Sequence, residues 1–250
     1  MKEVISFKNT YKNFKSKNVL SNLSFAVNEN EFLALLGNNG CGKTTTINLL
    51  CNLEKLNKGN ILVFEKNITS NYVSYRQKFG IVLSKPYYVE LFSIVEYLKF
   101  CCKFQKVNSN LINQRVEEML DLFALNDYSS TPIENLSSGL KMKVSIAASL
   151  IHNPDVLIYD EPFVNLDIQS LNEVIKVLKS LKQKKTLLIT SHSLDVITDL
   201  CDRFIVLENG QVSYEVNKTN CDSIDKIHEG LKDKLITPTT RHPSEIPWLK

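Results

Sequence analysis

Apolar residues in the first third of the chain occur in short runs that predict β-strands. Polar and apolar positions mix in residues 3–7 and 20–27, whereas residues 31–36 are almost continuously apolar. Residues 61–64 and 79–83 are two further short apolar runs. A continuous run of this length favours a strand that is buried on both faces. We therefore expect a β-rich N-terminal part that leads into a buried strand.

The spacing of apolar residues changes to a helical period in the middle of the chain. Residues 94–105 predict one helix and residues 110–125 a second, with Val116, Leu120 and Phe123 along one face. The helical part spans roughly residues 86–135. We expect it to be a subdomain inserted into a larger α/β core.

Strands and helices alternate again after this helical part. Residues 156–159 and 186–190 predict buried strands, and residues 169–181 predict a helix between them. This alternation is typical of a mostly parallel sheet. Residues 204–207 and 211–216 predict a hairpin, because a Glu-Asn-Gly turn separates them.

The domain prediction follows from these patterns. Residues 1–217 form one domain, with the helical subdomain at about 86–135 inserted in it. Residues 218–250 form a C-terminal tail that contains several prolines, and we expect this tail to be loop or partly disordered.

Composition and charge exclude several classes of protein. A hydrophobic fraction of 43% is enough for a core, and the net charge of +3 comes without a basic stripe, so no nucleic-acid partner is expected. No apolar run is long enough to cross a bilayer, and residues 1–5 do not resemble a secretion signal. The six cysteines form no C-x-x-C pair, which favours free thiols in a cytoplasmic protein.

A glycine-rich stretch follows the buried strand at residues 31–36 and matches the pattern G-x-x-x-x-G-K-[ST] completely. The backbone N–H groups of such a loop and of the following helix, residues 43–51, point at one spot that suits a polyphosphate. The Lys43 ammonium is expected to reach the outer phosphates, and the Thr44 hydroxyl to bind Mg²⁺. The stretch predicts a nucleoside triphosphate site made of Gly37, Asn38, Asn39, Gly40, Cys41, Gly42, Lys43, Thr44 and Thr45.

Two adjacent carboxylates end the strand at residues 156–159. The carboxyl end of a parallel strand is where ligands bind in such sheets. Asp160 is expected to hold the Mg²⁺ ion, and Glu161 to orient and polarise a water that attacks the γ-phosphate.

Ser137, Ser138 and Gly139, within Leu-Ser-Ser-Gly-Leu, precede a predicted helix and the two carboxylates. This segment resembles the signature of the ATP-binding cassette (ABC) family, the nucleotide-binding subunits of ABC transporters. The family pattern is Leu-Ser-Gly-Gly-Gln, so Ser138 and Leu140 depart from it. A hydroxyl and a bare backbone at a helix N-terminus suit a γ-phosphate.

Other residues match the family in the same order along the chain. Asp167, in Asn-Leu-Asp, resembles the D-loop that couples two such domains. His192 resembles the switch histidine, which implies contact with the γ-phosphate and support for Glu161. Phe14 aligns with the aromatic residue that stacks on adenine, and Tyr11 is the alternative.

Two positions raise questions about the chemistry. Family members usually carry Gln where this chain has Ser84, and the shorter hydroxyl reaches Mg²⁺ only through a water. Cys41 follows the loop glycines at a helix N-terminus, where a lowered thiol pKa and reactivity blocked by ATP are expected. The alternative is that Cys41 is a small residue that fills a tight loop.

The resemblance implies an α/β P-loop NTPase fold and an ATPase that uses ATP and Mg²⁺. It further implies two copies that sandwich two ATP molecules and drive a separate integral membrane permease, of export type, from the inner face of the cell membrane. Tyr87, Tyr88, Leu91 and Phe92 are candidates for the permease contact. The alternatives are a soluble ABC ATPase that acts on ribosomes or nucleic acid, and a P-loop kinase or GTPase.

Overall fold

The fold is built on two β-sheets. The computed structural model describes residues 2–15, 17–68, 70, 75–164, 166–192, 194–221 and 223–235. One sheet has four strands in the order β2-β1-β4-β5, and the other has six in the order β10-β9-β3-β8-β7-β6. The strands of the first sheet are β1 (Glu3–Phe14), β2 (Lys17–Asn28), β4 (Lys58–Val63) and β5 (Lys66–Asn67). Those of the second are β3 (Phe32–Leu36), β6 (Phe79–Val82), β7 (Val156–Asp160), β8 (Thr186–Thr190), β9 (Arg203–Glu208) and β10 (Gln211–Asn217).

The six-stranded sheet lies between two hydrophobic cores. Its strands from β9 to β6 pair in parallel, and β10 pairs antiparallel with β9 as the predicted hairpin. Leu33 and Leu35 of β3 face a core shared with the four-stranded sheet and α1 (Lys43–Leu50), whereas Phe32, Ala34 and Leu36 face the helices. Both faces of β3 are therefore covered, which explains its continuous apolar sequence.

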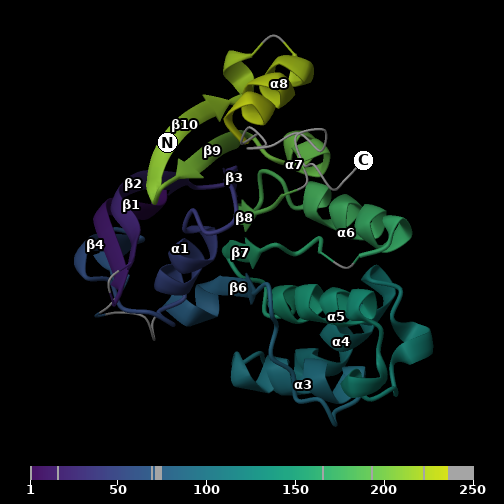
Figure 1. The fold of residues 1–250 in the computed structure, drawn as a ribbon. Coiled ribbons are helices and arrows are strands. Elements are labelled where there is room, and N and C mark those ends of the chain that lie inside the picture. Colours follow the sequence, from purple (N-terminus) through teal and green to yellow (C-terminus); the bar gives the residue numbers. More distant parts are fainter. Residues whose placement is uncertain are drawn as a thin grey trace, which may run out of the picture.

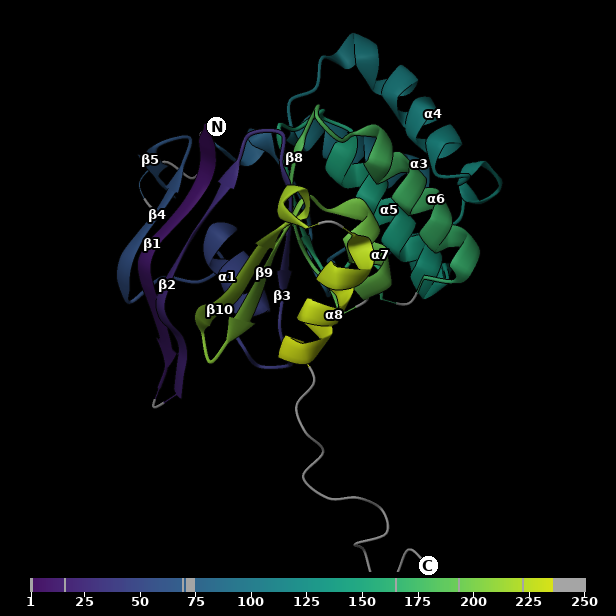
Figure 2. The same cartoon turned by 90° about the horizontal axis from the view of Figure 1, so that it is seen from above.

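Helices cover the second face of this sheet (Figures 1 and 2). They are α3 (Ile94–Phe104), α4 (Ile112–Leu122), α5 (Ser138–Leu150), α6 (Ile168–Ser180), α7 (Leu194–Leu200) and α8 (Ile224–Leu235). Short 3-10 turns flank several of these helices, among them η1 (Arg76–Lys78) before β6 and η5 (Lys218–Asn220) before α8. The helices α3 and α4 form a block packed on α5, beyond the β6 edge of the sheet (Figure 1).

The predicted fold class is confirmed: a mostly parallel sheet, an antiparallel N-terminal sheet and a helical insertion between β6 and β7. The first strand is longer than predicted, because β1 continues to Phe14. Asn9 has a left-handed φ of 46° where the β1–β2 register shifts, which marks a β-bulge. The bulge interrupts the alternation of buried and exposed side chains, so the sequence pattern predicted a strand that ends too early.

The C-terminal tail corrects a prediction. We expected loop from residue 218 onward, but α8 occupies Ile224–Leu235 and contacts α7. Ile227 and Leu231 are buried at helical spacing, and the prolines that suggested loop begin only at Pro238. Pro238 and Trp248 lie outside the described residues. Among the described residues, the helices are all too short or too polar to cross a membrane.

Candidate functional site

The predicted phosphate loop connects the carboxyl end of β3 to α1. Gly37 is required by close packing, because a Cβ there would lie 2.4 Å from the carbonyl oxygen of Leu207 in β9. Gly40 has a φ of 80°, which L side chains rarely adopt, and space lies open where its Cβ would stand. The loop therefore presents bare backbone toward the cavity in front of it.

The Lys43 side chain folds back and hydrogen-bonds to the backbone of the phosphate loop. Its side chain is buried, and its Nζ donates to the carbonyl oxygen of Gly37 at 2.6 Å and to that of Asn38 at 3.4 Å. Thr44 and Thr45 follow in the first turn of α1 and line the cavity. A positive charge and the helix N-terminus thus face the same space, which favours an anion there.

Asp160 is the last residue of β7 and is 1% exposed. Its Oδ1 accepts a hydrogen bond from Thr190 Oγ1 at 2.6 Å, across the β7–β8 pair. Its Oδ2 is buried without a hydrogen-bond partner among the described residues. A buried carboxylate oxygen with no donor is costly, and binding a cation would remove that cost.

Glu161 follows in a left-handed backbone conformation, with a φ of 51°. Its N–H donates to the Oγ1 and carbonyl oxygen of Thr190, at 2.9 Å and 3.2 Å. These hydrogen bonds stabilise the turn that follows β7. A non-glycine residue in this region carries strain of about 1–3 kcal/mol, which tends to occur at functional sites.

The Glu161 carboxylate meets His192 beyond the end of β8. Glu161 Oε1 lies 2.9 Å from His192 Nε2, and the side chains are 12% and 50% exposed. Burial raises the pKa of Glu161, and the nearby Lys43 ammonium opposes this. Burial and the Lys43 charge lower the pKa of His192, which favours the neutral imidazole. The pair therefore suits proton transfer between a carboxylate and water.

These groups surround one cavity of about 520 Å³. Phe14 lines it and is 40% exposed, whereas the alternative Tyr11 does not line it. The complete lining is Phe14, Lys17, Val19, Asn39, Gly40, Gly42, Lys43, Thr44, Thr45, Glu161 and His192. Gly37, Asn38, Cys41 and Asp160 stand behind this surface, in the loop or at the end of β7.

Five other predicted site residues lie away from this cavity. Ser137 caps α5 by accepting the Leu140 N–H at 3.2 Å, Ser138 is exposed, and Gly139 is buried in the first turn. Asp167 caps α6 by accepting from Ser170, which lowers the pKa of Asp167. Ser84 is exposed just beyond β6. Asn165, before Asp167, lies outside the described residues.

Cys41 does not have the lowered pKa expected from its position. The side chain is 8% exposed, and burial raises the pKa of the thiol despite the Lys43 charge. Its Sγ stands where a Cβ on Gly37 would lie. The alternative interpretation, a small residue that fills the loop, is therefore the better one.

The sequence analysis missed the role of Thr190. Its hydroxyl donates to Asp160 and accepts from the Glu161 N–H, so one side chain positions both carboxylates. The signal was available, because Asp160 and Thr190 are the last residues of two adjacent parallel strands. Lys17 and Val19, which also line the cavity, gave no such signal.

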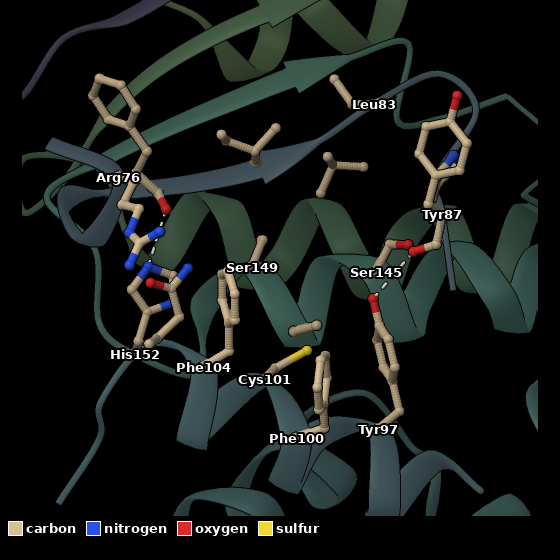
Figure 3. A pocket seen from close by; sticks show the side chains of 16 residues that line it. Arg76, Leu83, Tyr87, Tyr97, Phe100, Cys101, Phe104, Ser145, Ser149 and His152 are labelled. Atoms are coloured by element: carbon tan, nitrogen blue, oxygen red, sulfur yellow. Dashed lines mark hydrogen bonds between the residues drawn. The ribbon is translucent and has the colours of Figure 1, made fainter. Parts of the chain in front are cut away.

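A second hollow, of about 430 Å³, lies between β6 and the helices α3 and α5 (Figure 3). Tyr87, one of the predicted permease contacts, lines it and is 86% exposed. Leu91, another of them, is 78% exposed. The other two turn inward. Tyr88 OH donates to the Lys141 carbonyl oxygen at 2.8 Å, and the Phe92 ring lies edge-on to Phe100 at 6.0 Å.

Comparisons with known proteins agree with this geometry. Residues 20–164 match the profile of the family described as ABC transporter. The chain is 30% identical over 228 residues to the uncharacterized ABC transporter ATP-binding protein YhcH of Bacillus subtilis, covering 90% of the chain and 73% of YhcH. It is 34% identical to the spermidine/putrescine import ATP-binding protein PotA of Acetivibrio thermocellus, covering 84% of the chain but only 60% of PotA.

A solved structure has the same fold. The dimeric post-hydrolysis state of the ATP-binding cassette MJ0796, bound to ADP and Pi, superposes with a TM-score of 0.77 at 24% identity. The match covers 85% of this chain and 98% of MJ0796.

Proposed function

The chain belongs to the ABC transporter family of ATP-binding proteins and is an ATPase, and we propose that it works as one of two cassettes that power a separate membrane permease. The observation that carries this proposal is the division of the site. The phosphate loop, Glu161 and His192 share one cavity, whereas Ser137 and Gly139 of the same chain stand outside it.

ATP fits the cavity by the chemistry of its walls. Phe14 offers a ring for the base at the outer end, and the ring carries the Lys12 ammonium 4.4 Å from its centroid. The first turn of α1 and Lys43 offer N–H groups and positive charge to the phosphates. The triphosphate would draw the Lys43 ammonium from the loop carbonyls.

Mg²⁺ fits the donors behind the cavity. The Thr44 hydroxyl and the Asp160 carboxylate would hold it, because Asp160 Oδ2 is a buried oxygen with no partner among the described residues. Ser84 would contribute only through a water. When bound, the ion would neutralise phosphate charge.

Hydrolysis rests on Glu161 and His192. The Glu161 carboxylate accepts a proton from the attacking water, whose oxygen bonds to the γ-phosphorus while the bond to the β-phosphate oxygen breaks. His192 Nε2 lies 2.9 Å from Glu161 Oε1, so the imidazole would help to position the carboxylate. Because burial raises the pKa of Glu161, its ionised carboxylate is a stronger base than that of an exposed glutamate.

A second copy of the chain would complete the site. Ser137, Ser138 and Gly139 at the N-terminus of α5 would meet the γ-phosphate bound by the partner, and Asp167 would lie at the same junction. The dimeric MJ0796 structure supports this arrangement by its shared fold.

The permease would anchor the chain at the cytoplasmic face of the membrane. The exposed Tyr87 in the second hollow, the groove beside β6, and the exposed Leu91 four residues further along the chain support a protein contact in this region. We assign the transport direction as export because the segments 136–150 and 162–167 resemble export-type cassettes. A test uses inside-out vesicles that hold the complex, in which external MgATP should load the exported compound. ATP-driven release from the vesicles would reverse the assignment.

The test of the ATPase site compares wild type with Glu161→Gln. We expect hydrolysis to fall by a factor of about 100 or more, and the E161Q protein to accumulate as an ATP-bound dimer in light scattering. The exposed Glu208→Gln, at the end of β9, is the matched control. Equal turnover in E161Q and wild type would contradict the assignment of Glu161.

The test of the transporter role is purification from detergent-solubilised membranes. A multi-span membrane protein encoded beside this chain should co-purify at a fixed ratio. Recovery with ribosomes or nucleic acid instead would replace the transporter with the soluble ATPase alternative.

A further inference from the structure

Phe14, whose ring is proposed to stack on the nucleotide base, stands at an exposed end of the four-stranded sheet. It is the last residue of β1, it is 40% exposed, and it lines the nucleotide cavity. Lys15, the next residue, has a left-handed φ of 51° where the chain turns toward β2. An exposed ring at a turn has several rotamers open to it, so binding a base requires that the ring be ordered. A neighbour that already holds the ring would strengthen the binding of the base.

Lys12 is such a neighbour. It is only 7% exposed, which is unusual for a lysine. Its Nζ lies 4.4 Å from the centroid of the Phe14 ring. The same ammonium donates to Glu54 Oε2 and to the Lys55 carbonyl oxygen, both at 2.8 Å. An ammonium has three N–H donors, so two of them fix its position and one is left for the face of the ring.

The two hydrogen-bond partners of this ammonium belong to the segment that connects α1 to β4. Glu54 and Lys55 follow α1, whose N-terminus carries the phosphate loop. Two more hydrogen bonds attach this segment to β1. The Asn57 N–H donates to the Tyr11 carbonyl oxygen at 2.9 Å, and the Asn13 N–H donates to Asn57 Oδ1 at 2.8 Å. The ring at the end of β1 is therefore connected to the helix that faces the phosphates.

We propose that Lys12 is a positioning residue for nucleotide binding, which holds the Phe14 ring at a fixed place relative to α1. The base and the phosphates of one ATP molecule then meet two surfaces whose separation is already set. Lys12 does not line the cavity, so it acts on the nucleotide through the ring. The inference rests on the proposed stacking of the base on Phe14 and adds the residue that prepares this ring.

The alternative is that Lys12 only stabilises the fold. Its ion pair with Glu54 would then matter for unfolding and not for nucleotide binding. The Glu54 side chain is 36% exposed, and an ion pair with such a partner contributes little to stability. The connecting segment is also attached to β1 independently, through Asn57. A structural role changes the melting temperature alone, whereas a positioning role changes the affinity for ligands that carry a base.

The first test separates the base from the phosphates. Lys12→Met keeps the length of the side chain and removes its charge. The KM for MgATP should rise about three- to tenfold while kcat stays within about twofold, because the ring contributes equally to the ground state and the transition state. Tripolyphosphate has no base, so its binding in titration calorimetry should match wild type within about twofold. Equal weakening of MgATP and tripolyphosphate binding by K12M would overturn the proposal.

The second test is a double-mutant cycle with the ring. Phe14→Ala should by itself raise the KM for MgATP about tenfold or more, because the stacking surface is lost. Adding Lys12→Met to the F14A protein should have no further effect on KM, because no ring remains to be held. Independent effects that add in the double variant would show that Lys12 acts by another route, and the proposal would be wrong.

Two further variants control for the loss of a buried charge. Lys58 makes a similar contact, with its Nζ 5.5 Å from the centroid of the Tyr11 ring, and neither residue lines the cavity. Lys58→Met should therefore leave the KM for MgATP unchanged. Lys12→Arg keeps a charge that stacks on an aromatic face, so its KM should return to within about twofold of wild type. A K12R protein with the KM of K12M would contradict the role of the charge.

The results also distinguish this inference from the proposed function. If F14A has the same KM for MgATP as wild type, the base does not stack on Phe14, and that part of the proposed function fails. If F14A raises the KM but K12M does not, only the inference about Lys12 fails.

Discussion

The nucleotide cavity and the groove beside β6 lie on one sheet, but they are lined by different kinds of residue. The phosphate loop, Lys43 and the Glu161 carboxylate line the cavity at the ends of β3, β7 and β8, with the Asp160 carboxylate behind them. Side chains from β6, α3 and α5 form the groove, and most of them are aromatic or aliphatic. Phosphate chemistry restricts the residues in the nucleotide cavity, whereas the residues of the groove would have to match only the surface of the proposed permease. Loss of a single group should therefore stop the chemistry in the cavity and change only binding in the groove.

The largest expected effect is in the cavity. Lys43→Ala removes the charge that faces the phosphates, and ATP hydrolysis should fall by a factor of about 100 or more. Binding of the permease should stay within about twofold, because Lys43 lies outside the groove. A phosphate-release assay and co-purification measure the two effects, with the exposed Lys8→Ala as control. Loss of permease binding in K43A would show that the two hollows are not separable.

The next effect is the converse change in the groove. Tyr87→Ala removes an aromatic side chain that is 86% exposed, and permease affinity should fall by about 30-fold, as for an interface hot spot. Hydrolysis by the free protein should be unchanged. Tyr128, which is 43% exposed and does not line the groove, gives a matched control as Y128A. An equal loss in Y128A would place the contact elsewhere on the block.

Lowering the pH should slow ATP hydrolysis, by up to about tenfold per pH unit. In the proposed mechanism hydrolysis requires the Glu161 carboxylate, and burial raises the pKa of this group above its ordinary value of 4.5. The rate should therefore fall as pH decreases through that raised pKa, approaching about tenfold per unit below it. His192 has a lowered pKa, so its imidazole stays neutral to a lower pH than that of an ordinary histidine. A pH–rate profile at saturating MgATP measures this, and a midpoint below 4.5 contradicts the prediction.

Ser84 directly follows Leu83, which lines the groove, and its replacement should give a smaller change. Ser84→Gln provides a longer side chain with both donor and acceptor, able to link the nucleotide to the groove side. One added hydrogen bond is worth about 0.5–1.5 kcal/mol, so permease-stimulated hydrolysis should rise about two- to tenfold. Ser84→Ala is the control, because it removes the hydroxyl without adding reach. Equal rates in S84Q and S84A would mean that this position does not couple the sites.

The smallest expected effect is at Cys41. Because burial raises the pKa of its thiol, a maleimide at neutral pH should label Cys41 slowly and reduce hydrolysis by less than about twofold. Mass spectrometry of the labelled peptide with and without ATP measures this directly. Rapid labelling that ATP prevents would return Cys41 to the role of a reactive thiol.

The sequence predicted the cavity well because its parts are fixed by spacing. The phosphate loop must follow a strand and precede a helix, and Asp160 and Glu161 must end a parallel strand, so the folded neighbours of these residues follow from the pattern. Thr190 was missed because its role depends on the register between β7 and β8. Strand order and register arise from packing between distant segments, which a local pattern does not contain.

The groove and the tail show where sequence reasoning was weaker. Tyr87 and Tyr88 are adjacent in sequence, but one points outward and the other bonds to α5. Only the folded position of α5 decides between them. The α8 helix was missed because prolines after residue 237 dominated the composition of the tail, although Ile227 and Leu231 already have helical spacing.

The left-handed backbone at Glu161 has a consequence for how such a protein can change over generations. Glycine adopts a φ of 51° without strain and would remove a carboxylate whose charged form burial disfavours. The Glu161→Gly protein should therefore unfold at a temperature no lower than wild type while losing hydrolysis. Selection for turnover alone would hold the glutamate in place. After gene duplication, a cassette whose partner already hydrolyses ATP could lose this side chain without a penalty in folding.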